Sequence, residues 1–187
     1  MNEEVEIKVA LKNPEEVEAR LKEIAKFVKE KEQKDEYFTP KHEDFFALNP
    51  PVEYLRVRHE DGKDELHYNF LHFDDKKELL KTDEYEVPVG NPEMMSLILS
   101  KLDMINKVTV TKHRKTYDYK GFEVCLDFIK ELGHYIEVEA KKFDNVGKAK
   151  EECYAILDEL GADWDEIPLE LRGYPIMVLA KQGEDVS

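Results

Sequence analysis

The chain has 187 residues, of which 41% are hydrophobic and 38% are charged, and its formal net charge is -15. This length can bury a sizeable core, so we expect one domain over residues 1–187 with a frayed tail at residues 181–187. A surface this acidic repels nucleic acid backbones and anionic membranes, and we expect neither as a partner. We see no signal-peptide pattern and no membrane-spanning apolar run, and two cysteines without metal-binding spacing suit a reducing cytoplasm.

The N-terminal half predicts a strand, a helix and then several strands. Residues 4–11 alternate apolar and charged side chains, which is typical of a strand with one buried face. An Asn-Pro pair then begins a predicted helix over residues 14–30. An extended segment follows at residues 34–40, and Asp61-Gly62 predicts a hairpin between two further strands. The apolar stripe expected on the helix is Val17, Leu21, Ile24 and Val28.

The C-terminal half predicts three more helices and three strands. A helix begins at Asn91-Pro92, strands follow between residues 107 and 143, and Asp144 or Asn145 caps a third helix that ends at Gly161. We expect Trp164 in a loop, and then a short last helix that Pro175 interrupts. Hairpin turns outnumber helical crossovers, so the predicted class is α+β with a mostly antiparallel sheet. The expected buried side of the second helix is Met95, Ile98, Leu99 and Leu102.

Charged side chains alternate with apolar ones along several of the predicted strands. Any single charged strand face is ordinarily exposed to solvent. If the sheet curls, however, its apolar face packs beneath the helices and the charged faces enclose a polar lumen. The residues of these faces are Glu4, Glu6 and Lys8; Arg56 and Arg58; Glu84 and Glu86; Lys112 and Arg114; Glu123, Cys125 and Asp127; Glu137 and Glu139.

The two signs of charge in such a lumen suggest a chemistry. Carboxylates two residues apart on a strand lie about 6.5–7 Å apart, so acids from neighbouring strands can approach one hard cation or two. Arginine binds phosphate in a fork, and lysine adds a point charge. Acids for a divalent metal together with bases for phosphates indicate a metal–polyphosphate site. We find no serine or cysteine nucleophile motif, no GxGxxG loop and no P-loop, and the six histidines show no ligand spacing.

The segment EVEIK resembles the N-terminal ExExK signature of the CYTH superfamily, the triphosphate tunnel metalloenzymes. That superfamily includes class IV adenylyl cyclases, thiamine triphosphatases and inorganic triphosphatases. Further segments resemble family blocks in the family order across about the whole chain: QKDEYF, YLRVRHEDG, EYEV, VTKHRKTY and VCLDFIKELGHYIEVEA.

The resemblance implies an eight-stranded antiparallel β-barrel, the triphosphate tunnel, with helices packed outside, and Mg²⁺ or Mn²⁺ as cofactor. The implied metal ligands are Glu4, Glu6, Glu137, Glu139 and Asp127. The implied phosphate contacts are Lys8, Arg56, Arg58, Lys112 and Arg114, with Lys8, Arg56, Arg58 and Asp127 assigned to catalysis. Glu84 and Glu86 match acids of the middle strand whose role is less defined.

Two positions depart from the family pattern. Asn69 stands where a tunnel-facing lysine is usual, and Thr82 where an arginine is usual. A charge-assisted hydrogen bond contributes about 1.5–3 kcal/mol against about 1 kcal/mol for a neutral one, so both changes weaken the expected hold on phosphate. We still count Asn69 among the expected substrate contacts.

The expected function is a metal-dependent enzyme acting on ATP, thiamine triphosphate or tripolyphosphate. A short, stand-alone domain favours a class IV adenylyl cyclase, which converts ATP to cyclic AMP and pyrophosphate, with hydrolysis of thiamine triphosphate or tripolyphosphate as the alternative. Asn69 and Thr82 motivate a third interpretation, a triphosphate-binding protein with little turnover. A homodimer is compatible with the sequence.

Overall fold

The computed structural model describes residues 5–48, 50–60, 62–75, 77, 79–168, 171 and 173–184. Glu4 and Asp61, which the sequence analysis singled out, lie outside these residues. The strands are β1 (Val5–Leu11), β2 (Lys26–Pro40), β3 (Glu53–Glu60), β4 (Glu65–Phe73), β5 (Leu79–Pro88), β6 (Met104–Tyr119), β7 (Phe122–Ile129), β8 (Gly133–Ala140) and β9 (Trp164–Glu166). The helices are α1 (Pro14–Ile24), α2 (Pro92–Lys101), α3 (Val146–Leu160) and α4 (Tyr174–Lys181).

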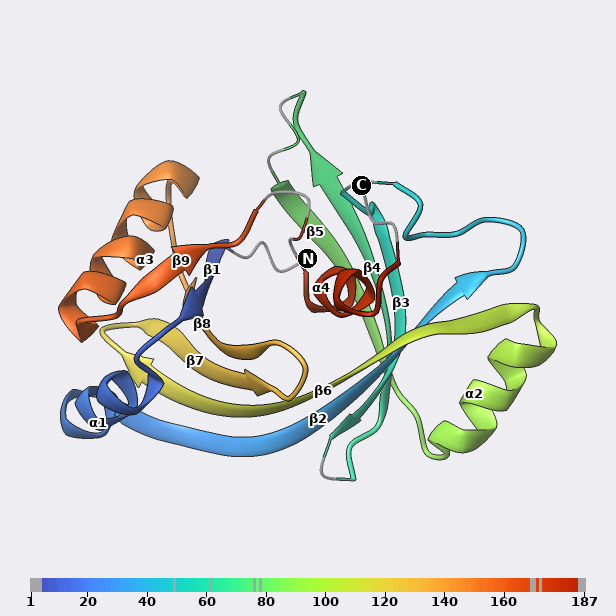
Figure 1. The fold of residues 1–187 in the computed structure, drawn as a ribbon, viewed down its shortest axis with the longest axis horizontal. Helices are drawn as coiled ribbons and strands as arrows, with labels where there is room; N and C mark the ends of the chain where they lie inside the picture. The colour runs from blue at the N-terminus through green and yellow to red at the C-terminus, as the bar shows by residue number, and fades with distance from the viewer. Residues whose placement is uncertain are drawn as a thin grey trace. The chain divides into compact units, whose positions relative to one another are not determined.

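The predicted α+β class is confirmed, because antiparallel strand pairs dominate and helices join or follow them (Figure 1). The nine described strands hydrogen-bond in the order β5-β4-β3-β2-β6-β7-β8-β1-β9. We expected eight strands in a closed barrel. Among the described residues the order has two ends, β5 and β9, and the additional strand is the three-residue β9.

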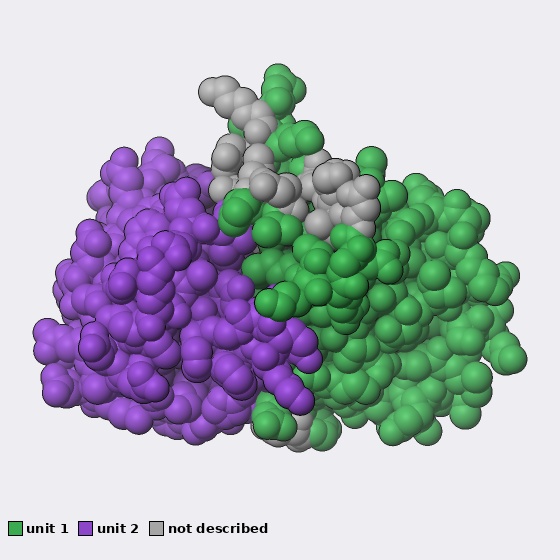
Figure 2. Space-filling view, in the orientation of Figure 1, with its two compact units in different colours: residues 1–3, 32–111, 168–187 green, residues 4–31, 112–167 purple. Residues whose placement is uncertain are grey.

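The chain forms two compact units, shown in two colours in Figure 2. Unit 1 contains the described parts of residues 32–111 and 168–187, and unit 2 those of residues 4–31 and 112–167. Strands β2 and β6 each contribute residues to both units. The single domain expected over residues 1–187 stays a prediction.

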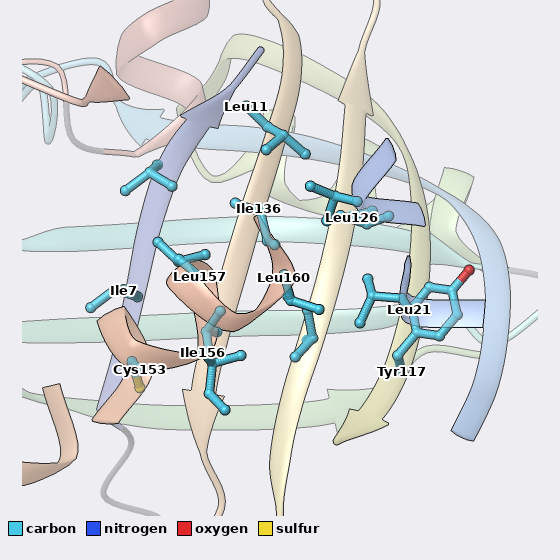
Figure 3. Close-up of a cluster of buried hydrophobic side chains, with 14 of the residues drawn as sticks. Ile7, Leu11, Leu21, Tyr117, Leu126, Ile136, Cys153, Ile156, Leu157 and Leu160 are labelled. Carbon is cyan, nitrogen blue, oxygen red and sulfur yellow. The ribbon is translucent and has the colours of Figure 1, made fainter. Parts of the chain in front are cut away.

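Unit 2 has its core between helices and one face of its sheet (Figure 3). The apolar residues of β1, for example Ile7 and Leu11, point into this core, as the alternation predicts. Leu21 of α1 and Leu157 of α3 have no exposed surface. Burial of each contributes about 1.5–3 kcal/mol to folding. Asn145 caps α3 by accepting a hydrogen bond from the backbone N–H of Lys148 at 2.9 Å.

Unit 1 has a smaller core between α2 and its sheet. Phe38, Val57 and Leu99 are buried there, and Met95 packs against them. Ile98 and Leu102, which the sequence analysis placed on the buried side, are 46% and 69% exposed. The buried apolar stripe of α2 is therefore narrower than predicted, because only one line of its side chains contacts the sheet.

Helices α1, α2 and α3 pack on apolar sheet faces, as predicted, whereas α4 lies against the charged face of unit 1. The backbone of Gly173, just before α4, runs so close to Tyr54 that a Cβ atom there would lie 3.0 Å from the tyrosine hydroxyl oxygen. Tyr54 is two residues before Arg56 and shares its strand face. Gly173 also has a φ of +101°, which favours glycine.

Four local predictions need correction. The first helix ends at Ile24 and residues 26–30 begin β2, because this charged segment continues the long strand instead of extending the buried stripe. Trp164 belongs to β9, which pairs with β1, and its ring packs 5.6 Å from that of Tyr154. Pro175 occupies the first turn of α4 instead of interrupting it, because proline suits that position.

The fourth correction concerns the C-terminal tail. Residues 182–184 are tied by backbone hydrogen bonds to the last turn of α4, so the described part of the expected frayed tail is ordered. Residues 185–187 lie outside the described residues. None of the described helices is both long and apolar enough to cross a membrane.

Candidate functional site

The sequence-predicted charged residues divide between the two units. Unit 2 holds Glu6, Lys8, Lys112, Arg114, Asp127, Glu137 and Glu139. Unit 1 holds Arg56, Arg58, Asn69, Glu84 and Glu86. In both units these side chains lie on the sheet face opposite the apolar core, so the predicted segregation of charged and apolar faces is confirmed.

The charged face of unit 2 is organised in rows across its strands. Residues directly opposite each other in an antiparallel pair share a face and have Cβ atoms about 4.5–5.5 Å apart. The first row runs Glu6, Glu139, Glu123, Asp118 across β1, β8, β7 and β6. The second row runs Lys8, Glu137, Cys125, Thr116. Arg114 and Asp127 stand opposite each other in the third.

Two acids bind the basic side chains Lys8, Lys112 and Arg114 on the charged face of unit 2. Arg114 donates to both carboxylate oxygens of Asp127, with Nε 2.6 Å from Oδ1, and it also donates to Glu137. The Nζ atom of Lys8 lies 2.8 Å from Glu137 Oε1, and that of Lys112 lies 3.8 Å from Asp127 Oδ2. Burial alone would raise the pKa of Glu137, but Arg114, Lys8 and Lys112 outweigh it and hold this pKa well below its usual range.

In the first row of unit 2 the pKa values of Glu6 and Glu139 are raised, in contrast to the lowered pKa of Glu137. Burial, then the neighbouring carboxylates Glu123, Glu6 and Glu137, raise the pKa of Glu139. The pKa of Glu6 is also raised, by burial and by Glu137, although Lys8 acts against both. The Glu6 side chain remains 42% exposed, so solvent screens part of this repulsion. Acids that repel one another become more stable when a cation lies between them.

This row suits a hard divalent cation by its chemistry, because Mg²⁺ and Mn²⁺ prefer carboxylate oxygens. Among the described residues, no three His, Cys, Asp or Glu side chains already converge closely enough to hold a metal ion. Of the four predicted ligands that the structure describes, Glu137 and Asp127 bind cationic side chains closely. Glu6 lies 3.9 Å from Lys8, and burial and neighbouring carboxylates raise the pKa of Glu139. Cys125 is buried, and burial raises the pKa of its thiol to about 12, so it is not an activated nucleophile.

The charged face of unit 1 is also built in rows. Asp35, Arg58 and Glu65 lie opposite one another on β2, β3 and β4. The next row contains Tyr37, Arg56, His67 and Glu86, and the third contains Tyr54, Asn69 and Glu84. Arg58 donates to both oxygens of Asp35, each at 2.7 Å. This pair is the counterpart of Arg114 and Asp127 in unit 2.

Arg56 is less completely bound than Arg58. Its guanidinium donates to the Tyr37 hydroxyl at 3.3 Å and lies 3.4 Å from Nδ1 of His67. Its Nε atom is buried and has no hydrogen-bond partner within the part of the chain that the structure describes. Asn69 donates to Glu84 at 2.8 Å, while its own side-chain oxygen likewise lacks a partner there. Arg56 and Asn69 thus retain hydrogen-bonding capacity for a ligand.

The sequence analysis missed two residues of unit 1, Asp35 and His67. His67 is only 2% exposed and contacts Glu86, Glu65 and Arg56 through its ring nitrogens. Alternation along β4 could have identified it, because His67 stands two residues before Asn69 and so shares its face. Asp35 could have been found only from strand register, which its spacing in the sequence does not reveal.

Comparisons with known proteins now define the family. The family model of the CYTH domain matches residues 2–165. A protein of Methanocaldococcus jannaschii, named "Putative adenylate cyclase MJ0240", is 35% identical over 178 residues, which cover 91% of this chain and 98% of that protein. The chain therefore belongs to the CYTH domain family.

Solved structures share the fold. The PH1819 protein of Pyrococcus horikoshii has a TM-score of 0.72 and 25% identity, covering 95% of this chain and 99% of its own. The Hippeastrum protein described as "Putative adenylyl cyclase HpAC1" has a TM-score of 0.68 and 17% identity, covering 98% and 97%. The description of the Hippeastrum protein reports a dominant triphosphatase activity.

Proposed function

We propose that this chain is a divalent-metal-dependent enzyme acting on a nucleotide or other triphosphate. The observation that carries the proposal is the separation of charge within unit 2. Glu137 and Asp127 bind the basic residues, while Glu6 and Glu139 form an acidic row in which burial, then neighbouring carboxylates, raise the pKa values. A site with both features can take a metal ion and the phosphates that accompany it.

The proposal gives roles to several of the predicted residues. Glu6 and Glu139 would hold Mg²⁺ or Mn²⁺, together with Glu4, which lies outside the described residues. The bound metal would polarise phosphoryl oxygens. Within unit 2, Lys8 and Lys112 would add positive charge for the phosphates, and within unit 1 the Arg56 guanidinium would donate to an anion. Asp127 is best understood as a positioning residue, because its buried carboxylate fixes the plane of the Arg114 guanidinium.

We favour adenylyl cyclase chemistry because of the name given to the M. jannaschii relative. In that reaction the ribose 3′-hydroxyl of ATP attacks the α-phosphorus and pyrophosphate leaves. A triphosphatase, in which water attacks a terminal phosphorus, is the second candidate, and the description of the Hippeastrum protein supports it. The bond between Asn69 and Glu84 supports a third, a binding protein with little turnover, because it engages the neutral amide that stands where the family usually has a lysine.

One experiment distinguishes these candidates. The protein is incubated with ATP, tripolyphosphate or thiamine triphosphate in the presence of Mg²⁺ or Mn²⁺, and products are identified by phosphorus NMR. Cyclic AMP with pyrophosphate would support the cyclase, and free phosphate the triphosphatase. Ligand binding without product would support the binding protein. If no ligand bound and no product formed with either metal, the proposal would be wrong.

A further inference from the structure

His67 of unit 1 is a histidine whose two ring nitrogens both face carboxylates. Its Nδ1 atom lies 2.7 Å from Glu86 Oε1, and its Nε2 atom lies 3.2 Å from Glu65 Oε2. The ring is 2% exposed, so water cannot take the place of either partner. The same Nδ1 atom lies 3.4 Å from the Arg56 guanidinium.

The two carboxylate contacts could each accept a ring N–H, so together they suit a ring with one more proton than a neutral imidazole carries. A neutral ring has one N–H donor and one lone pair, so it can donate to only one of the two carboxylates. The other contact then joins a lone pair to a carboxylate oxygen, which is unfavourable unless a proton lies between them. An imidazolium ring donates to both carboxylates and satisfies both contacts.

The arginines beside the ring oppose this protonation in the free protein. Burial, then Arg56 and Arg58, lower the pKa of His67 to about 4, against Glu65, which raises it. An anion bound to the arginines would offset their charge and remove part of that cause. The charged or titratable groups facing the ring are Glu65 on its own strand, Arg56 and Arg58 on β3, Glu84 and Glu86 on β5, and Asp35 and Tyr37 on β2.

We propose that His67 takes up a proton from solvent when a polyphosphate binds at Arg56 and Arg58, and so supplies positive charge that Asn69 cannot. This inference rests on the proposed function, because it assumes that the charged face of unit 1 contacts phosphate. One proton moves from solvent to a ring nitrogen, and the Glu65, His67 and Glu86 group changes its charge from -2 to -1. His67 occupies the row next to Asn69, where a permanent lysine charge was expected. In this chain a titratable group takes the place of that charge.

Proton linkage makes the inference measurable. A ligand that favours the protonated ring binds more weakly as pH rises, by at most about tenfold per pH unit for one proton. The probe is tripolyphosphate, titrated calorimetrically into the full chain with a chelator present, which prevents metal-dependent turnover. Titrations in two buffers of different ionisation enthalpy give the number of protons taken up.

The test compares the wild type with His67→Gln and His72→Gln. Glutamine keeps a polar side chain of similar size at position 67, and His72 lies on the same strand but on its other face. Because tripolyphosphate itself exchanges protons with the buffer, the quantity to compare is the difference in proton uptake between the wild type and each variant. We expect His67→Gln to lower proton uptake by up to one proton per ligand and to flatten the pH dependence of affinity, while His72→Gln behaves as the wild type. Equal uptake by the wild type and His67→Gln would overturn the inference.

A second measurement avoids any dependence on the variant's folding. The ring resonances of His67 in the wild type are followed by NMR while tripolyphosphate is added at pH 7. Movement toward the imidazolium position supports the inference, and an unchanged resonance at saturation refutes it. If the wild type bound no tripolyphosphate and turned over no triphosphate, the proposed function would fail as well. Binding with an unchanged His67 would remove only the inference.

Discussion

Each unit has an arginine–aspartate ion pair on the charged face of its sheet, but the other charged residues of that face differ between the units. Each carries a bidentate pair of arginine and aspartate on its charged face, Arg58 with Asp35 in unit 1 and Arg114 with Asp127 in unit 2. Unit 2 carries, two rows from its pair, a row of acids that includes Glu6 and Glu139, whose raised pKa values favour a cation. In unit 1 the row next to the pair holds an arginine beside a buried histidine. The two pairs are thus alike, and the other charged residues of each unit determine which charge a ligand should carry.

The largest effect should come from removing the acidic row of unit 2. We expect Glu6→Gln with Glu139→Gln to lower turnover of the active triphosphate by about 1,000-fold, because no adequate metal site would remain. Steady-state rates across a range of Mg²⁺ and Mn²⁺ concentrations measure this loss. Glu159→Gln, an exposed acid of unit 2 that pairs with Lys120, is the matched control and should retain activity. A double variant with wild-type rates would show that the metal lies elsewhere.

Breaking each of the two aspartate–arginine pairs should lower the free energy of unfolding by a different amount. Asp35→Asn removes the carboxylate that binds both nitrogens of Arg58, and we expect a loss of about 3 kcal/mol in the free energy of unfolding. Asp127→Asn should cost less, because Arg114 keeps Glu137. Urea unfolding followed by circular dichroism measures both. The exposed Asp103 pairs with Lys41, and Asp103→Asn should change little. Equal losses for Asp35→Asn and Asp127→Asn would contradict the comparison.

Restoring the family's lysine should make unit 1 a stronger anion site. In Asn69→Lys the new ammonium can pair with Glu84 and still reach a ligand, so tripolyphosphate affinity should rise by roughly tenfold. Calorimetry at constant ionic strength measures the gain. Thr109→Lys adds the same charge at an exposed position of unit 1 and controls for net charge. A gain of equal size in Thr109→Lys would mean that the higher affinity comes from the change in net charge and not from the position of the new lysine.

The smallest effect concerns pH and the acids of unit 2. A carboxyl group whose pKa is raised by folding stabilises the folded state at low pH, and this contribution is lost as pH rises through the folded pKa. In the absence of metal, the raised pKa values of Glu6 and Glu139 should therefore make the chain less stable as pH rises above the ordinary glutamate range, and the effect should be small because solvent screens the partly exposed Glu6. Thermal unfolding of the wild type and Glu139→Gln measures this, and the variant should show a flatter profile. Identical profiles would mean that Glu139 titrates normally.

Much of this arrangement could be predicted from the sequence, because period-two alternation fixes which side chains share a strand face. That rule correctly grouped Arg56 with Arg58 and Glu137 with Glu139. It does not give strand register, and register decides that Glu139 neighbours Glu6 while Glu137 neighbours Lys8. The pairing of Asp35 with Arg58 was missed for the same reason.

Helix limits and partial exposure were harder to predict. The helix expected to reach residue 30 ends at Ile24, because tertiary pairing of a long strand overrides a continuing helical period. On α2 the periodic stripe did not distinguish residues that contact the sheet from residues such as Leu102 that face solvent.

The boundary between the units has a consequence for how this protein can be divided. Neither unit is one continuous stretch of chain, since residues 168–187 return to unit 1 after unit 2 has been completed. The boundaries at residues 31/32 and 111/112 also fall inside β2 and β6. A single cut therefore yields no fragment that contains all of one unit and nothing of the other. Any single cut instead leaves at least one fragment with parts of both units, so two-piece complementation cannot be used to recover one unit on its own.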